Sequence, residues 1–334
     1  MTHRCGIIGT GLQATRRVRA LIEAADAEPV AVAGATPDTT KAFAAEHGLN
    51  AVADWRELVA DDGIDVVLVC VPPHLHAEMT LAALHAGKHV LCEKPLARTA
   101  DEADEMCRVA RATGRVLGCG FNHRHHPALA ALGDRIARGE LGRPLWARAA
   151  YGIAGRDGYE REWRADPRQV SGGQLMEQGI HVVDLLRSYF GEVEAVTSLR
   201  SSTVWPIAPL EEDAMVLLRH HSGVLAQLHS SLTQWVNTFR LEVGGDEAVA
   251  EVQGLAGSYG TQSLSVWPRT DGPFTVTRQE FRSGDRSWAL EWAEFARLLS
   301  LPAPDRTSAL DGAAAIRVVA AAYTAADTLT WEKP

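Results

Sequence analysis

The stretch Cys5-Gly6-Ile7-Ile8-Gly9-Thr10-Gly11-Leu12-Gln13-Ala14 decides the fold of the N-terminal part of this 334-residue chain. The apolar run Cys5–Ile8 predicts a buried strand, and apolar residues at helical spacing over Leu12–Ala25 predict a helix directly after it. The turn between them fits G-x-G-x-x-A, whose glycines allow a tight turn and close backbone approach. Strand, turn and helix together predict a pyrophosphate site at the helix N terminus, formed by Gly9, Gly11, Leu12, Gln13 and Ala14.

Strands and helices continue to alternate as far as about residue 121. Apolar runs bounded by turn residues predict strands at Cys5–Ile8, Val30–Ala33, Asp65–Val71, His89–Cys92 and Val116–Phe121, within a sheet of six. Six strands separated by helices indicate a doubly wound parallel sheet of the Rossmann type. We therefore expect residues 1–121 to form a dinucleotide-binding domain.

From about Asn122 the pattern changes to strand-like runs without helices between them. The predicted strands are Leu145–Tyr151, Ala195–Arg200, Ala214–Arg219, Val224–Leu232 and Phe239–Val243, and the predicted helices are Pro127–Arg138, Trp288–Leu299 and Leu310–Ala326. In Phe239–Val243, apolar residues alternate with Arg240 and Glu242, which is typical of a sheet with one face in water. Residues 122–334 are predicted to form an α+β domain with a large, mostly antiparallel open sheet, for substrate binding and oligomerisation.

Composition argues against several classes of partner. Lys and Arg total 33 against 42 Asp and Glu, and this net charge of −9 argues against binding to nucleic acid or to an anionic membrane. Apolar runs such as Val66–Val71 and Ala313–Ala322 are shorter than the roughly 18 residues that a membrane span needs. Five cysteines without a C-x-x-C pair, and an N terminus without the features of a signal peptide, favour a cytoplasmic location.

The end of the second strand bears on the choice between NAD and NADP. An acidic residue there would bind the ribose 2′-hydroxyl of NAD, but the sequence reads Ala33-Gly34-Ala35-Thr36. The Thr36 hydroxyl and the Lys41 cation remain as candidate contacts for the ribose of the cofactor. The missing acid favours NADP, and NAD stays the alternative because no arginine stands nearby.

Polar residues follow the fourth, fifth and sixth strands. Ligands of open α/β sheets bind outside the carboxyl ends of strands. We therefore expect a cofactor site lined by Pro72, His76, Glu93, Lys94 and Asn122.

A second group of titratable residues belongs to a predicted helix of the second domain. Glu177, His181 and Asp184 stand at i, i+4 and i+7, and residues at this spacing share one helix face. A single histidine gives no metal-ligand spacing, and we interpret the loop histidines His123, His125 and His126 as polar lining. No metal site is predicted.

Four segments carry a resemblance to a known family. Val71–His76, Cys92–Leu96, Gly120–Arg124 and Gly172–Asp184 resemble, in kind and order, the glucose–fructose oxidoreductase/inositol dehydrogenase family, often called Gfo/Idh/MocA. The resemblance covers essentially the whole chain. It implies that Lys94 and His181 meet at the substrate hydroxyl as the catalytic pair, and that the substrate is bound by Asn122, Trp163, Arg164, Glu177 and Asp184. The family usually has Asp where Glu177 stands.

This resemblance implies an NAD(P)-dependent oxidoreductase that transfers hydride between a nicotinamide cofactor and a hydroxyl or carbonyl carbon of a sugar, cyclitol or related polyol. An imidazole suits the acid/base role because its free pKa is near neutral, and an ammonium group stabilises a developing alkoxide. His181 and Lys94 take these roles, which could be exchanged. The alternatives are a reductase of a non-sugar carbonyl, imine or dihydrodiol, a catalytically inactive dinucleotide-binding regulator, and a redox-neutral glycosidase that holds NAD.

Two further expectations concern specificity and assembly. Loops 151–171 and 201–212 are expected to select the substrate, with candidates Tyr151, Tyr159, Arg161, Trp205 and Glu211. Family members often pair the outer faces of their second-domain sheets, which implies a homodimer or a dimer of dimers.

Overall fold

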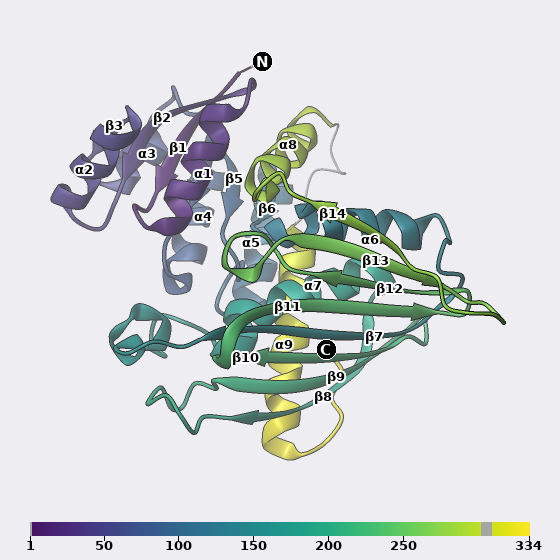
Figure 1. Ribbon diagram of the computed structural model, residues 1–334. Coiled ribbons are helices and arrows are strands. Elements are labelled where there is room, and N and C mark those ends of the chain that lie inside the picture. Colours follow the sequence, from purple (N-terminus) through teal and green to yellow (C-terminus); the bar gives the residue numbers. More distant parts are fainter. Residues whose placement is uncertain (1, 302–308) are drawn as a thin grey trace. The chain divides into compact units, whose positions relative to one another are not determined.

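The computed structural model describes residues 2–301 and 309–334 and forms two compact units (Figure 1). The first unit comprises Met1–Asn122 and Trp288–Ala313, and the second comprises His123–Ser287 and Ala314–Pro334. The predicted domains 1–121 and 122–334 include residue 1 and residues 302–308, which lie outside the described residues.

The first unit contains a six-stranded parallel sheet in the order β3-β2-β1-β4-β5-β6. Its strands are β1 (His3–Ile8), β2 (Ala27–Ala33), β3 (Asn50–Val52), β4 (Val66–Val69), β5 (His89–Cys92) and β6 (Leu117–Cys119). The predicted doubly wound parallel sheet is thereby confirmed. Strand order reverses between β1 and β4, which is where such sheets bind ligands.

Local sequence accounts for the helices around this sheet, which are α1 (Leu12–Glu23), α2 (Pro37–His47), α3 (Trp55–Ala60), α4 (His76–His85), α5 (Ala100–Thr113) and α8 (Ser287–Ser300). The Thr36 hydroxyl caps α2, and Thr99 forms a capping box with Glu102 at the start of α5. Gly48 and Gly114 end α2 and α5 in the left-handed conformation that glycine adopts readily.

Helix α8 belongs to the first unit, although the sequence analysis assigns its residues to the second domain. Trp292 and Phe295 are buried in one core cluster with Cys5 and Ile7 of β1. The Trp292 indole also donates a hydrogen bond to Asp26 Oδ1 at 2.9 Å. Burial of two large aromatic side chains explains why this late segment completes the first unit.

The second unit contains an eight-stranded sheet in the order β14-β13-β12-β11-β7-β10-β9-β8. Its strands are β7 (Pro144–Ala154), β8 (Val193–Ser201), β9 (Asp213–His220), β10 (Leu225–Ser231), β11 (Thr233–Gly245), β12 (Ala248–Gln253), β13 (Gln262–Pro268) and β14 (Thr277–Phe281). Only the β7–β10 pairing is parallel, so the predicted mostly antiparallel sheet is confirmed. The sequence analysis did not identify β12, β13 and β14.

Helices cover one face of this sheet. Figure 1 shows α7 (Ile180–Phe190) and most of α9 (Ala309–Thr328, yellow) behind the strands, with α6 (Pro127–Ala137) near β13. By length and composition α9 could cross a membrane, which the sequence analysis did not indicate, but more than half of its most apolar stretch is buried inside the protein. The Ser198 hydroxyl of β8 donates to the Ala322 carbonyl at 2.5 Å, which ties α9 to the sheet.

Candidate active site

The predicted phosphate turn lies where the ends of β1 and β4 meet. Gly9 has φ +117°, and a Cβ there would lie 2.2 Å from the Cys70 carbonyl oxygen, so no larger residue fits. A Cβ on Gly11 would meet no described atom within 4 Å. Among the described residues no side chain caps α1, and Leu12 at its start is 61% exposed. These features fit a dinucleotide pyrophosphate, since the α1 N terminus offers backbone N–H groups toward open space.

The expected ribose contacts lie at the start of α2. A Cβ on Gly34 would lie 2.7 Å from both Thr10 Cγ2 and Thr40 Oγ1, which leaves no room for a carboxylate side chain. The Thr36 hydroxyl accepts a hydrogen bond from the Thr39 backbone N–H at 3.3 Å. Lys41 is exposed on α2. A polar contact from Thr36 to a ribose therefore competes with its role as the helix cap.

Two predicted cofactor contacts, His76 and Glu93, lie beneath the strand ends. His76 is fully buried, and its Nδ1 and Nε2 each lie 2.8 Å from a carbonyl oxygen, of Pro95 and Val71 respectively. Burial lowers the pKa of His76. Glu93 is buried, accepts a hydrogen bond from Arg17 Nε at 2.9 Å, and forms an ion pair with Arg17 Nη2 at 2.8 Å. Both side chains therefore support the segment that contains Lys94 from inside the unit.

Arg17, on α1 after the predicted phosphate turn, is a residue near the site that no sequence motif marks. Its guanidinium is almost fully buried, pairs with Glu291 of α8 as well as with Glu93, and lies 4.7 Å from the Trp288 ring centroid. Burial alone would lower the pKa of Arg17, but these two carboxylates raise it. This ion-pair network joins α1 to the carboxyl end of β5. Lys94 and Asn122, which follow β5 and β6, are also buried, and Pro72 after β4 is partly buried.

In the second unit, two glycines lead into the segment that contains His181. A Cβ on Gly172 would lie 2.1 Å from the Tyr323 hydroxyl, and a Cβ on Gly173 would lie 2.0 Å from the Glu211 carbonyl oxygen. A π-helical turn, Leu175–Gly179, follows and continues directly into α7. Such turns recur at functional sites because they change which side chains share a helix face.

The His181 ring is buried and stacked on another imidazole. Its centroid lies 3.8 Å from that of His123, with an angle of 19° between the ring planes. His123 Nε2 in turn lies 3.1 Å from the Tyr151 hydroxyl of β7. The sequence interpretation of His123 as polar lining therefore understates its contact with His181, and the predicted specificity candidate Tyr151 is buried behind His123.

The two carboxylates expected beside His181 have separate partners. Asp184 is fully buried, and its two oxygens accept hydrogen bonds from Arg124 Nε at 2.6 Å and Nη2 at 2.5 Å. Glu177 Oε1 accepts a hydrogen bond from Arg164 Nε at 3.3 Å. The Arg164 guanidinium lies 4.3 Å from the Trp163 ring centroid. The structure thus brings together Trp163, Arg164 and Glu177, while Asp184 pairs with Arg124, which the sequence analysis did not single out.

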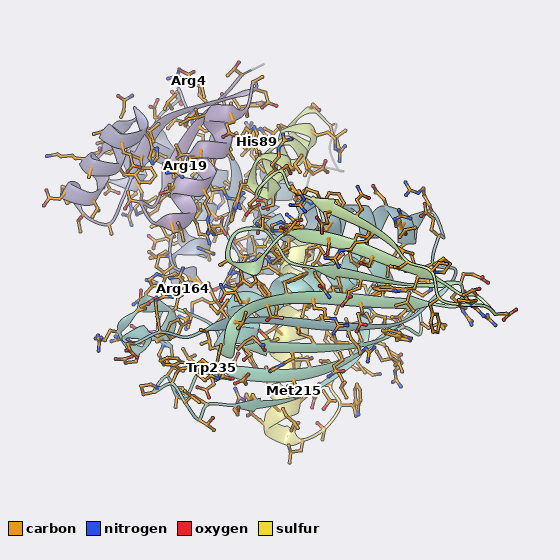
Figure 2. The ribbon with its side chains drawn as sticks, in the orientation of Figure 1. Arg4, Arg19, His89, Arg164, Met215 and Trp235 are labelled. Carbon is orange, nitrogen blue, oxygen red and sulfur yellow. The ribbon has the colours of Figure 1, made fainter. Side chains whose placement is uncertain are left out.

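The remaining loop candidates differ in exposure. Arg161 is exposed and pairs with Glu160, whereas Tyr159 is buried in a small cluster that Trp205 packs against. Glu211 is 3% exposed, so it does not select the substrate by direct contact from an open loop. Figure 2 shows Arg164 and Trp235 near the same end of the eight-stranded sheet.

Comparison with known proteins defines the class of this chain. Residues 3–121 match the "Oxidoreductase family, NAD-binding Rossmann fold", and residues 129–251 match the "GFO/IDH/MocA C-terminal domain". The chain belongs to the Gfo/Idh/MocA family of oxidoreductases. It is therefore an NAD(P)-dependent dehydrogenase or reductase.

Individual relatives act on carbohydrates. The chain is 36% identical to 1,5-anhydro-D-fructose reductase of Ensifer adhaerens over 248 residues, covering 73% of this chain and 74% of that protein. It is 27% identical to D-xylose 1-dehydrogenase (NADP(+)) 2 of Haloferax volcanii, covering 97% of each. The solved structure of levoglucosan dehydrogenase in complex with NADH and levoglucosan shares the fold, with a TM-score of 0.89, 24% identity, and coverage of 100% of this chain and 99% of that one.

Arg124→Ala should destabilise the protein, because it leaves the Asp184 carboxylate buried without this cation. We expect the free energy of unfolding, measured by urea denaturation, to fall by about 3–5 kcal/mol. Replacing both partners with apolar residues, Arg124→Met with Asp184→Leu, should restore part of that loss. Arg168→Ala is the control, because it removes a surface ion pair with Asp166. The urea midpoint of this variant should barely change. An Arg124→Ala midpoint equal to the control's would show that Asp184 does not depend on Arg124.

Proposed function

We propose that the protein oxidises a hydroxyl carbon, or reduces the corresponding carbonyl, of a sugar, anhydrosugar or cyclitol, with His181 and Lys94 as its catalytic residues. The observation that carries the proposal is the buried His181 ring, held by His123 at the start of a helix that a glycine pair introduces. Carbohydrate activity of the relatives supports the substrate class.

The proposed chemistry divides between a proton and a hydride. A nicotinamide cofactor, when bound, would supply the hydride chemistry at the substrate carbon, and the residues of this chain would handle the proton and the charge on oxygen. His181 takes the hydroxyl proton during oxidation and gives it back during reduction, since an imidazole changes charge near neutral pH. The Lys94 ammonium group stabilises the negative charge that develops on the same oxygen. Stacking on His123 restricts the His181 ring to one plane, which favours proton transfer along one direction.

Residues near Glu177 suit a polyol. Arg164 and Glu177 form an ion pair at 3.3 Å and are both partly exposed, so a ligand hydroxyl group can reach a charged donor and a charged acceptor side by side. The ring of Trp163, on which Arg164 stacks, adds an apolar surface of the kind that packs on sugar C–H groups. We propose that these three residues, with Asn122, bind the substrate.

We propose NADP as the preferred cofactor, with NAD as the alternative. Gly34 has no room for the acidic side chain that would bind an unmodified ribose, and Lys41 offers an exposed cation on the neighbouring helix. One relative is named for NADP. Binding of a 2′-phosphate then depends on Lys41 and on the hydroxyl of Thr36.

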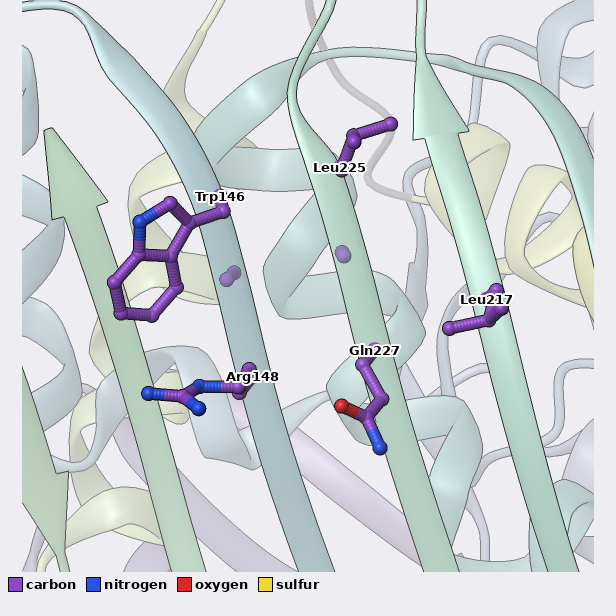
Figure 3. A pocket seen from close by; sticks show the side chains of 7 residues that line it. Trp146, Arg148, Leu217, Leu225 and Gln227 are labelled. Carbon is purple, nitrogen blue, oxygen red and sulfur yellow. The ribbon is translucent and has the colours of Figure 1, made fainter.

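We also propose that the protein forms a homodimer or a dimer of dimers through the sheet face opposite α7 and α9. Along β9, Met215 and Leu217 are exposed, while Ala214, Val216 and Leu218 are buried. Leu217 and Leu225 line a shallow hollow on this face together with Trp146, Ala147, Arg148, Ala226 and Gln227 (Figure 3). Exposed apolar side chains grouped around a hollow, with polar residues among them, are typical of a protein interface.

The catalytic assignment predicts large and unequal effects of two substitutions. Lys94→Ala and His181→Ala should each lower kcat by about 10²- to 10⁴-fold, measured as reduced-cofactor absorbance with a panel of sugars and polyols. His181→Ala should leave cofactor affinity nearly unchanged, because the phosphate turn is in the other unit. The double variant should lose less than the product of the single losses. Near-normal turnover by His181→Ala would refute the assignment.

The cofactor proposal predicts a selective effect at Lys41. Lys41→Ala should weaken NADP about tenfold in calorimetric titrations, equivalent to about 1.4 kcal/mol, and change NAD affinity much less. Lys333→Ala, which removes an exposed lysine near the C terminus, is the matched control. A wild-type protein that binds NAD more tightly than NADP would contradict the proposal.

The assembly proposal predicts that negative charges introduced among the residues that line the hollow will separate the subunits. Leu217→Glu with Leu225→Glu should give a 36.1 kDa species by light scattering at about 10 μM, because buried unpaired carboxylates oppose association. Ile22→Glu, an equally exposed apolar position on α1, should leave the oligomer intact. A wild-type protein that already behaves as a 36.1 kDa monomer would overturn this proposal.

A further inference from the structure

The segment that contains His181 begins without a capping side chain of its own. Gln174 stands at the N-cap of the π-helical turn, and it makes no side-chain capping bond among the described residues. The first N–H groups of a helix need acceptors when they are buried. In this protein the acceptor comes from a distant part of the chain, the segment that precedes β9.

Glu211 supplies that acceptor with both carboxylate oxygens. Oε2 accepts a hydrogen bond from the Gly173 N–H and Oε1 from the Leu175 N–H, each at 2.9 Å. The Tyr323 hydroxyl of α9 donates to Oε1 at 2.8 Å. The Glu211 carbonyl oxygen also accepts from the Gln174 N–H at 3.0 Å, so one residue binds three consecutive backbone N–H groups.

The close packing around this carboxylate requires the glycine pair before the helix. Gly173 contacts the Glu211 backbone so closely that a Cβ would lie 2.0 Å from its carbonyl oxygen, and Gly172 leaves room for the Tyr323 hydroxyl. Glu211 is only 3% exposed, and burial raises the pKa of its carboxyl group. Burying a carboxylate is costly. A serine or aspartate at the N-cap would satisfy a helix terminus without that cost, so stability alone does not explain Glu211.

We infer that Glu211 is a positioning residue for His181, an inference that rests on the proposed function. By fixing the backbone of Gly173–Leu175, Glu211 sets the starting point of the π-helical turn and hence the place of His181 against His123. The Tyr323 hydroxyl donates to the same Oε1 atom that accepts the Leu175 N–H. A displacement of about 1 Å in a reacting group costs up to about 10²-fold in rate, so a rigid starting point affects turnover directly.

The next residue provides a matched control. Glu212 is also fully buried, but its carboxylate accepts hydrogen bonds from the backbone N–H groups of Thr203, Val204 and Trp205 at 2.6–3.1 Å. Burial opposes ionisation of Glu212, but these donors lower its pKa. Glu211 and Glu212 are thus adjacent buried carboxylates with the same kind of hydrogen bonds. The carboxylate bonds described here join Glu211 to the segment that leads to His181, and Glu212 to residues 203–205.

The experiment compares Glu211→Gln with Glu212→Gln in the full-length protein. A glutamine at 211 presents one oxygen and one NH₂ group, so either the Gly173 or the Leu175 N–H faces a donor. We expect kcat of Glu211→Gln to fall between about 10- and 100-fold with KM for the cofactor nearly unchanged. Hydrogen–deuterium exchange should accelerate over 173–181 in this variant. In Glu212→Gln exchange should accelerate over 203–205 instead and keep the wild-type rate over 173–181.

Tyr323→Phe keeps the carboxylate and both backbone donors and provides a milder second test should Glu211→Gln fail to fold. It should lower kcat about threefold and accelerate exchange over the same 173–181 segment. Unchanged exchange over 173–181 in Glu211→Gln or in Tyr323→Phe, or the same acceleration there in Glu212→Gln, would overturn the inference. Normal turnover by Glu211→Gln while His181→Ala is inactive would overturn only the inference. Normal turnover by both would overturn the proposed function as well.

Discussion

Carboxylates removed from water must be paired, and this constraint organises the surroundings of both proposed catalytic residues. Glu93, which immediately precedes Lys94, is buried against Arg17 of the phosphate-binding helix. Asp184, one helical turn after His181, is buried against Arg124. In each unit the charge beside the reactive group is held by an arginine with planar, directional donors, which fixes the backbone on which the reactive side chain stands.

A second constraint is that backbone segments must approach each other closely at both sites, which requires glycine. Gly9 allows the end of β1 to approach the carbonyl of Cys70, and Gly173 allows the segment that leads to His181 to approach Glu211. A side chain at either place would separate two elements whose ends form a binding or reactive site. The same physical requirement therefore explains the glycines of the phosphate turn and those of the Gly172-Gly173 pair, although one serves an anion-binding helix end and the other a buried carboxylate.

The sequence predicts those parts of the fold in which local pattern and tertiary environment agree. β4 reads as a nearly continuous aliphatic run because both of its faces are buried. The sequence does not predict β13, because its buried positions include Ser263 and Ser265 and buried positions therefore do not read as apolar. Helix α8 was recognised as a helix, but only the burial of Trp292 beside β1 reveals which unit it completes. Motifs predict Lys94 and His181 as catalytic residues, whereas the contacts of Arg17, His123, Arg124 and Glu211 join residues distant in sequence. A charged residue on a helix is usually solvated, so nothing local marks such a partner.

Glu177 illustrates how one methylene group changes the role of a position. With an aspartate, as the family usually has, the carboxylate would stay closer to the helix. The longer glutamate accepts a hydrogen bond from Arg164, whose guanidinium also stacks on Trp163. The ion pair offsets the charge of the Glu177 carboxylate, and because both side chains are partly exposed it places a donor beside an acceptor where aspartate would offer an acceptor alone. Under the proposed function, an ion pair without net charge suits an uncharged polyol better than an anionic substrate, since no net positive charge remains to offset a ligand carboxylate or phosphate.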